Sequence, residues 1–170
     1  MGEVTMLRYS ALICASIILA SGVVSAQSDV TVDTSQLKGP RPLEEETKAA
    51  AIRDYLESWQ AMDEAFQRDQ PGRLDEDFIG TAKEKLAEAV DEQTKAGIHT
   101  LYQDRAHHIQ FLFYSPEGLS IELIDDADYD VQVFDHDKAI SKVPVSARYI
   151  VVLTPAEVRW KVRVMQASSQ

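Results

Sequence analysis

Cysteine is almost absent from this chain of 170 residues, because Cys14 is the single one. Ile13 precedes Cys14, whereas bacterial lipid attachment requires a small residue there, so the sequence does not fit a lipoprotein. Cys14 itself lies in a segment with the features of a cleaved signal peptide. The rest of the chain has no cysteine, which excludes disulfides and thiol chemistry and leaves stability to the hydrophobic core.

Basic residues are scarce relative to acidic ones. The chain has 17 lysines and arginines against 28 aspartates and glutamates, a formal net charge of -11. Such a charge repels phosphate backbones and anionic lipid headgroups, so we expect no nucleic-acid partner. The carboxylates recur along the whole chain, which is typical of an acidic, well-solvated surface.

Several motifs that define common enzymes and cofactor sites are missing. The sequence has no glycine-rich phosphate loop, no Cys/His zinc spacing and no Gly-x-Ser-x-Gly elbow. We therefore expect no cofactor. The length and a hydrophobic content of 45% are sufficient for one core, which favours one domain.

The first 26 residues predict export. An apolar run is followed by Val24-Ser25-Ala26, the small-x-small pattern that signal peptidase recognises. Cleavage after Ala26 gives a secreted or periplasmic protein, whether translation starts at Met1 or at Met6. An alternative is an uncleaved segment from 9 to 26, which is nearly long enough to span a bilayer and would tether the domain to a membrane.

The sequence after the signal peptide divides into a leader and a domain. Residues 27–43 are polar and show no sustained periodicity, so we interpret them as a flexible leader. The domain covers 44–168 and begins with an amphipathic helix that ends at Asp69-Gln70-Pro71-Gly72. Its apolar face consists of Ile52, Tyr55, Leu56, Trp59, Met62, Ala65 and Phe66.

A second helix is predicted from Thr81 to Gly97. Thr81 and Glu84 have the spacing of a capping box, and Gly97 has the place of a C-terminal cap. Beyond Gly97 the apolar period changes to two, which predicts strands. The alternating residues include Ile109, Phe111 and Phe113, then Leu119 to Val133 with a bulge at Asp125-Asp126, then Val143 to Leu153, and last Val158 to Val164.

Helices followed by hairpin-linked strands predict an α+β fold, with the helices packed on one face of a curved antiparallel sheet. A family resemblance agrees with this order. The pattern runs through Tyr55, Trp59, Ala65-Phe66, Asp69, Leu74, Phe78-Ile79-Gly80, Ala82, Leu86, Gly97, Tyr102 and the strand from Leu119 to Asp130.

This pattern resembles the cone-shaped nuclear-transport-factor-2-like (NTF2-like) superfamily, and within it the intermembrane-space domain of plastid-division proteins. The resemblance covers roughly Ala49 to Met165. It implies a cone of helices and sheet around a pocket, which members use as an isomerase or dehydratase site, as a ligand or peptide site, or fill with side chains. Many members dimerise through the sheet.

Two groups of residues are candidates for catalysis in such a cone. His108 with Asp104 and Tyr102 can form a proton-transfer site, because a carboxylate can orient a histidine that titrates near neutral pH. Asp126 is an alternative acid or base. Adjacent strand residues point to opposite faces, so His107 and His108 cannot both enter one pocket.

Aromatic residues at helical and strand spacing are candidates for a ligand cavity or for plain core. They are Tyr55, Trp59, Phe66, Phe111 and Tyr129. The acidic stretch Asp125, Asp126, Asp128 and Asp130 alternates along a strand and makes a row rather than a cage, so we expect no metal site.

These patterns favour an exported, non-catalytic module that binds a small apolar ligand or a protein partner. The partner is either a second copy, bound through the sheet, or an envelope protein. Two alternatives stay open: a pocket enzyme of the isomerase or dehydratase type that uses His108 or Asp126, and a membrane-tethered module.

Overall fold

The computed structural model describes residues 28–168, so the predicted signal peptide lies outside the described range. The elements follow in the order β1 (Asp29–Asp33), α1 (Glu45–Arg68), a 3-10 helix η1 (Pro71–Leu74), α2 (Gly80–Ala96), β2 (Ile98–Tyr114), β3 (Ile121–Asp135), β4 (Lys138–Pro155) and β5 (Trp160–Ser168). Within residues 28–168, no helix combines the length and apolar character that crossing a bilayer requires.

Helix α1 confirms the first predicted helix and its end. Its buried face includes Tyr55, Trp59, Met62 and Phe66, three or four residues apart, as an amphipathic helix requires. The helix ends at Asp69, whose left-handed φ of 53° reverses the chain before Pro71 begins η1. The aromatic residues predicted from the helical spacing therefore all face the sheet.

Helix α2 confirms the second prediction apart from its N-terminal cap. Ile79 precedes the first turn, and no side chain caps it. The Thr81 hydroxyl donates instead to the main-chain carbonyl of Arg163, at 3.2 Å, so the predicted capping box is wrong. Gly97 does cap the C-terminus, with a φ of 72° and its N–H directed to Gln93 and Thr94.

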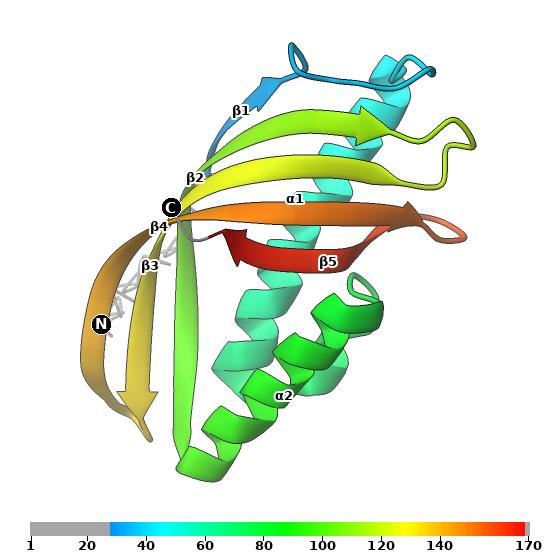
Figure 1. Cartoon of the computed structure of the whole chain (residues 1–170). Coiled ribbons are helices and arrows are strands. Elements are labelled where there is room, and N and C mark those ends of the chain that lie inside the picture. The colour runs from blue at the N-terminus through cyan, green and yellow to red at the C-terminus, as the bar shows by residue number, and fades with distance from the viewer. Residues whose placement is uncertain (1–27, 169–170) are drawn as a thin grey trace, which may run out of the picture.

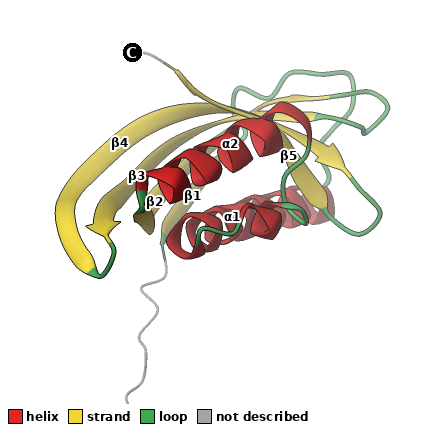
Figure 2. Cartoon of the chain, turned by 90° about the horizontal axis from the view of Figure 1, so that it is seen from below, coloured by secondary structure: helices red, strands yellow, loops and turns green. Residues whose placement is uncertain are grey.

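The strands form one five-stranded sheet in the order β1-β2-β3-β4-β5. Strands β2 to β5 pair antiparallel, as predicted, whereas β1 joins β2 in parallel. Both helices lie against the concave side of the curved sheet, and α1 and α2 run side by side beneath it (Figures 1 and 2). The predicted α+β architecture with helices on one face of a curved sheet is confirmed.

Strand β1 corrects the interpretation of residues 27–43 as a flexible leader. It pairs in register with β2 from Asp29 against Ala106 to Asp33 against Gln110. Further along, the Lys38 N–H donates to the Leu112 carbonyl at 2.8 Å. Five residues are too short for a clear periodic signal, and the sheet rather than local propensity orders them.

Bulges curve the sheet at positions that the sequence does not reveal. The register of β2 and β3 shifts between Asp104 and Ala106 and again between Phe111 and Phe113, while the pairing at Asp125 and Asp126 is regular. The predicted bulge at Asp125-Asp126 is therefore wrong. Because of the second shift, Tyr114 becomes buried in place of Phe113.

Two buried carboxylates fasten strand β5 to the helical layer. Asp54 of α1 is 2% exposed and accepts the main-chain N–H of Trp160 at 2.7 Å. Asp77, which precedes α2, is 6% exposed and accepts from the Arg159 guanidinium at 2.5 Å. These contacts hold the last strand over the helices and close that side of the cone.

The segment that joins β1 to α1 supplies a test of its order. Gly39 has a φ of 141°, and a Cβ there would lie 2.7 Å from the Tyr114 carbonyl oxygen. Gly39→Ala should therefore lower the free energy of unfolding by about 1–3 kcal/mol in chemical denaturation. Gly72→Ala is the matched control, because no atom lies within 4 Å of its added Cβ. Equal effects of both changes would contradict an ordered segment packed on β2.

Candidate functional site

A charged cluster lies inside the cone, between α1 and the strands β2 and β3. Nδ1 of His107 is 2.7 Å from Oδ2 of Asp125, and the Tyr55 hydroxyl donates to the same carboxylate oxygen at 2.8 Å. His107 is 2% exposed, and Tyr55 and Asp125 are 0% exposed. The Asp125 carboxylate of β3 therefore joins His107 of β2 and Tyr55 of α1, and all three side chains are shielded from solvent.

The surroundings of the cluster are aromatic and incompletely hydrogen-bonded. The Trp59 ring packs edge-on against the His107 ring, with centroids 5.0 Å apart. Nε2 of His107 lies 3.6 Å from Oδ2 of Asp104, an ion-pair rather than a hydrogen-bond distance. Among the described residues, Trp59 Nε1, His107 Nε2 and Asp125 Oδ1 are buried without a hydrogen-bond partner. The cluster thus contains buried hydrogen-bond donors and acceptors that no other group of the fold pairs with.

Tyrosines continue this polar interior toward β4. The hydroxyls of Tyr129 and Tyr149 are 2.6 Å apart, and both rings contact Trp59, with centroids 5.4 and 5.6 Å away. Tyr102 packs between Phe66 and Tyr129. Burial raises the pKa of Tyr102 to about 12 and, with the Tyr129 hydroxyl, raises the pKa of Tyr149 further. Tyr102 and Tyr149 therefore keep their protons at neutral pH.

The charge state of His107 follows from two opposed effects. Burial lowers its pKa, but the Asp104 and Asp125 carboxylates favour the charged ring and raise the pKa to about 9. Burial and the Asp125 charge also raise the pKa of the Tyr55 hydroxyl well above its usual value. At neutral pH the cluster is an imidazolium between carboxylates, with a protonated tyrosine. A proton donor fits this state and a general base does not.

The structure separates the residues predicted for catalysis into two groups. Asp104 and Tyr102 lie on the inner side, near His107 and the aromatic core. His108 is exposed on the outer face, where its Nδ1 is 2.6 Å from the Thr31 hydroxyl of β1. Asp126 also faces outward and forms a two-point ion pair with Arg148, which holds the pKa of that carboxyl below its usual value. His108 and Asp126 are therefore not part of the interior cluster.

His107 and Asp125 are the interior residues that the sequence interpretation missed. The alternation of side chains along a strand could have identified them. His107 lies on the same face of β2 as Ile109 and Phe111, and Asp125 lies on the same face of β3 as Leu123 and Ala127. All four of these apolar residues are buried, and the two ionisable residues with them. Neither residue lies at a bulge, so every second residue from His107 or Asp125 points to the same inward face.

The residues predicted to bind a ligand form part of the hydrophobic core. Tyr55, Trp59, Phe66, Phe111 and Tyr129 are each at most 6% exposed and pack in one cluster. They surround the charged cluster rather than an entrance from solvent. In the structure described here the inside of the cone is filled with side chains at these positions.

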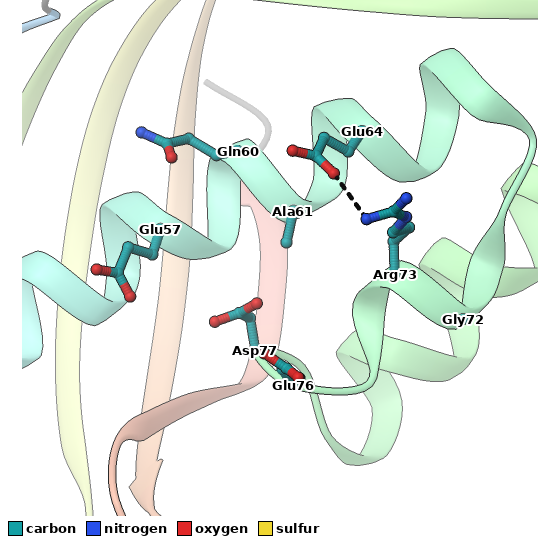
Figure 3. A pocket seen from close by; sticks show the side chains of 8 residues that line it. All are labelled: Glu57, Gln60, Ala61, Glu64, Gly72, Arg73, Glu76 and Asp77. Carbon is teal, nitrogen blue, oxygen red and sulfur yellow. Dashed lines mark hydrogen bonds and ion pairs between the residues drawn. The ribbon is translucent and has the colours of Figure 1, made fainter.

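A groove of about 320 Å³ lies outside the cone, between α1 and the segment from η1 to α2 (Figure 3). Half of its lining residues are acidic, but Glu64 pairs with Arg73 at 3.2 Å, and Asp77 pairs with Arg159. Glu57 also lies 3.7 Å from Arg159. In residues 28–168 no group of three or more histidine, cysteine or acidic side chains is arranged to hold a metal ion. The groove is therefore a solvated surface on which Glu57, Glu64 and Asp77 each lie within ion-pair distance of an arginine.

Comparison with known proteins identifies the fold. No protein-family model matches the chain, and no curated protein matches it. The intermembrane-space region of the chloroplast protein ARC6 superposes with a TM-score of 0.60 at 11% identity, over 76% of this chain and 100% of that one. A scytalone dehydratase candidate from Novosphingobium aromaticivorans superposes with a TM-score of 0.50 at 9% identity, over 74% and 89%. The chain therefore has the NTF2-like cone fold.

The buried imidazolium predicts a stability that depends on pH. The pKa of His107 is about 9 in the folded chain, above its ordinary value of 6.5, so its contribution is complete below pH 6.5 and is lost as the pH rises through 9. We expect the free energy of unfolding to fall by about 3 kcal/mol over that window. Urea unfolding at a series of pH values measures it. His107→Asn should flatten the curve, and an unchanged slope in that variant would assign the effect to other groups.

Neighbouring aspartates on opposite faces provide a second test. Asp125→Asn removes the charge that His107 requires, and breaking a buried pair typically costs about 3–5 kcal/mol. Asp126→Asn breaks a solvent-exposed pair with Arg148 and should cost much less. Urea unfolding of the two variants at neutral pH compares them directly. A larger loss for Asp126→Asn would contradict the interior placement of Asp125.

Proposed function

We propose that the exported chain is a non-catalytic binding module whose partner is another protein of the cell envelope, bound on the outside of the cone. The observation that carries this proposal is the closure of the interior. Tyr55, Trp59, His107 and Asp125 are each at most 2% exposed, so neither a substrate nor an apolar ligand reaches them in this conformation. Recognition then depends on the outer surface.

The charge state of the cluster supports the same conclusion. In the histidine site considered from the sequence, the imidazole would act as a base and abstract a proton from the substrate. With a pKa of about 9, His107 holds its proton at neutral pH, and two nearby carboxylates stabilise that form. The ion pair between His107 and Asp125 joins β2 to β3, and the Tyr55 hydrogen bond adds α1, as a structural tie between helix and sheet requires.

Export supports an envelope location. The N-terminal segment has the pattern of a signal peptide, with cleavage expected after Ala26. The region of ARC6 with the same fold is the part of that chloroplast protein in the intermembrane space. An extracytoplasmic setting for this chain is consistent with both observations.

A second candidate function is a pocket enzyme in which His107, Asp125 and Tyr55 take the roles first considered for His108 and Asp126. The favouring observation is the set of unpartnered buried atoms on Trp59, His107 and Asp125. This function requires α1 to move away from the sheet so that a substrate can enter. His107 would then donate a proton rather than remove one.

Cross-linking of the exported chain in its own cells tests the proposed function. We expect cross-links from the outer surface of the cone to one envelope protein, and the same cross-links in Tyr55→Phe, because that change alters only the interior. Loss of cross-linking in Tyr55→Phe, with the fold intact by circular dichroism, would favour the interior site. A chain that sediments as a monomer and yields no cross-linked partner would contradict the proposal.

A further inference from the structure

The first half of β4 is an open edge of the sheet. β4 pairs with β3 along nearly its whole length, from Lys138 to Leu153, but pairs with β5 only from Arg148 to Pro155. Among the described residues, 138–147 therefore have a strand on one side and none on the other. Figures 1 and 2 show this part of β4 at the outer margin of the curved sheet, away from both helices.

An open edge presents main-chain donors and acceptors that an incoming extended chain can satisfy. Pro144 lies within this edge, and proline is tolerated in a strand where its nitrogen faces away from the ladder. Alternation then directs the main-chain groups of Lys142 and Ser146 to the same open side. The edge can thus accept another strand along residues 138–147, with one donor missing at Pro144.

The side chains of the edge are basic and apolar. Lys138 and Lys142 are its charged residues, and 138–147 contain no carboxylate, although acids outnumber bases in the whole chain. Ile140 is 55% exposed and Val143 is 50% exposed. Among the described residues no carboxylate lies within ion-pair distance of Lys138, and Lys142 reaches Asp130 at 3.5 Å. An acidic and apolar partner complements this composition.

Strand β3 shows which sequence pattern β4 accepts on its paired side. On the outer face Asp126 bonds to Arg148, Asp128 accepts from Ser146, and Asp130 pairs with Lys142. On the inner face the alternate residues Ala127 and Tyr129 are buried. β4 therefore pairs with a strand that alternates carboxylates and apolar residues.

We propose that the open edge at residues 138–147 binds an extended segment of the partner protein in which acidic and apolar residues alternate. On the outer face the acidic side chains lie beside Lys142, and on the inner face the apolar ones pack beside Val143 and Val145. Lys138 lies beyond the register shift of β3 and β4 at Val133 and Phe134 and adds positive charge at the end of the edge. This inference rests on the proposed function and names the surface and the chemistry of its partner. It adds a strand to the sheet without altering the filled interior.

Charge favours this partner over a second copy of the chain. Two copies paired edge to edge would bring Lys138 and Lys142 of one close to those of the other. Each copy also carries a formal net charge of -11, so association is opposed at long range as well. A short acidic segment is attracted to the lysines of the edge and avoids the long-range repulsion between two acidic domains.

Binding of a designed peptide to the mature chain is the test. The probe is a ten-residue peptide that alternates glutamate and valine, and the control peptide has the same composition with all the glutamates in one block. We expect saturable binding of the alternating peptide alone, with amide-exchange protection or chemical-shift changes concentrated in residues 138–147. Because lysines contribute, the affinity should fall as ionic strength rises.

Charge-reversed variants locate the site. Lys138→Glu with Lys142→Glu should weaken binding about tenfold, since each exposed attraction becomes a repulsion. Lys85→Glu with Lys95→Glu is the matched control, because both lysines are exposed on α2 and the net-charge change is the same. We expect the control to bind as the unaltered chain does.

Three results would overturn the inference. They are no saturable binding at about 1 mM peptide, equal binding of the block peptide, and protection of residues 138–147 by self-association without peptide. The cross-linking experiment separates this failure from failure of the proposed function. If Lys138→Glu with Lys142→Glu keeps its envelope partner, the edge is wrong and the binding function stands, whereas a chain with no partner contradicts both.

Discussion

The buried contact between His107 and Asp125 constrains the rest of the structure. A charge inside a protein is tolerated only when it is paired and hydrogen-bonded, so the helix and two strands that supply Tyr55, His107 and Asp125 must keep their positions together. Shifting β2 by one residue would direct His107 to solvent and leave the Asp125 carboxylate buried without its partner. The contact therefore fixes both the strand register and the distance of α1 from the sheet.

This constraint connects the fold to the proposed function. A cone held closed by a charged cluster and packed with aromatic rings offers its surface rather than its interior. In the groove beside α1, the carboxylates of Glu64 and Asp77 are already paired with arginines. The open edge of β4 differs from them, because it combines unpaired main chain, two lysines and exposed apolar side chains. An interaction module with a closed interior and an open strand edge at residues 138–147 accounts for these features together.

The sequence predicts the long helices and strands well, because each apolar pattern repeats over many residues. The apolar face of α1, the break at Pro71 and the cap at Gly97 all follow from local chemistry, and the structure confirms them. β1 and the bulges are not predictable in this way, because five residues carry little periodic signal and a bulge changes phase without a distinctive residue type. Choosing candidate residues by their type alone also leads to the wrong residues for the interior cluster. His108 and Asp126 attract attention as ionisable residues, yet alternation with Ile109 and Leu123 places His107 and Asp125 inside.

Nuclear magnetic resonance of the His107 imidazole nitrogens tests the central claim most directly. If the ring is a closed, doubly stabilised imidazolium, both nitrogens stay protonated through neutral pH and titrate with a pKa of about 9. Their protons should exchange slowly, because the side chain is 2% exposed. A pKa at or below 6.5 with rapid proton exchange would show an open, neutral histidine and contradict the closed cone.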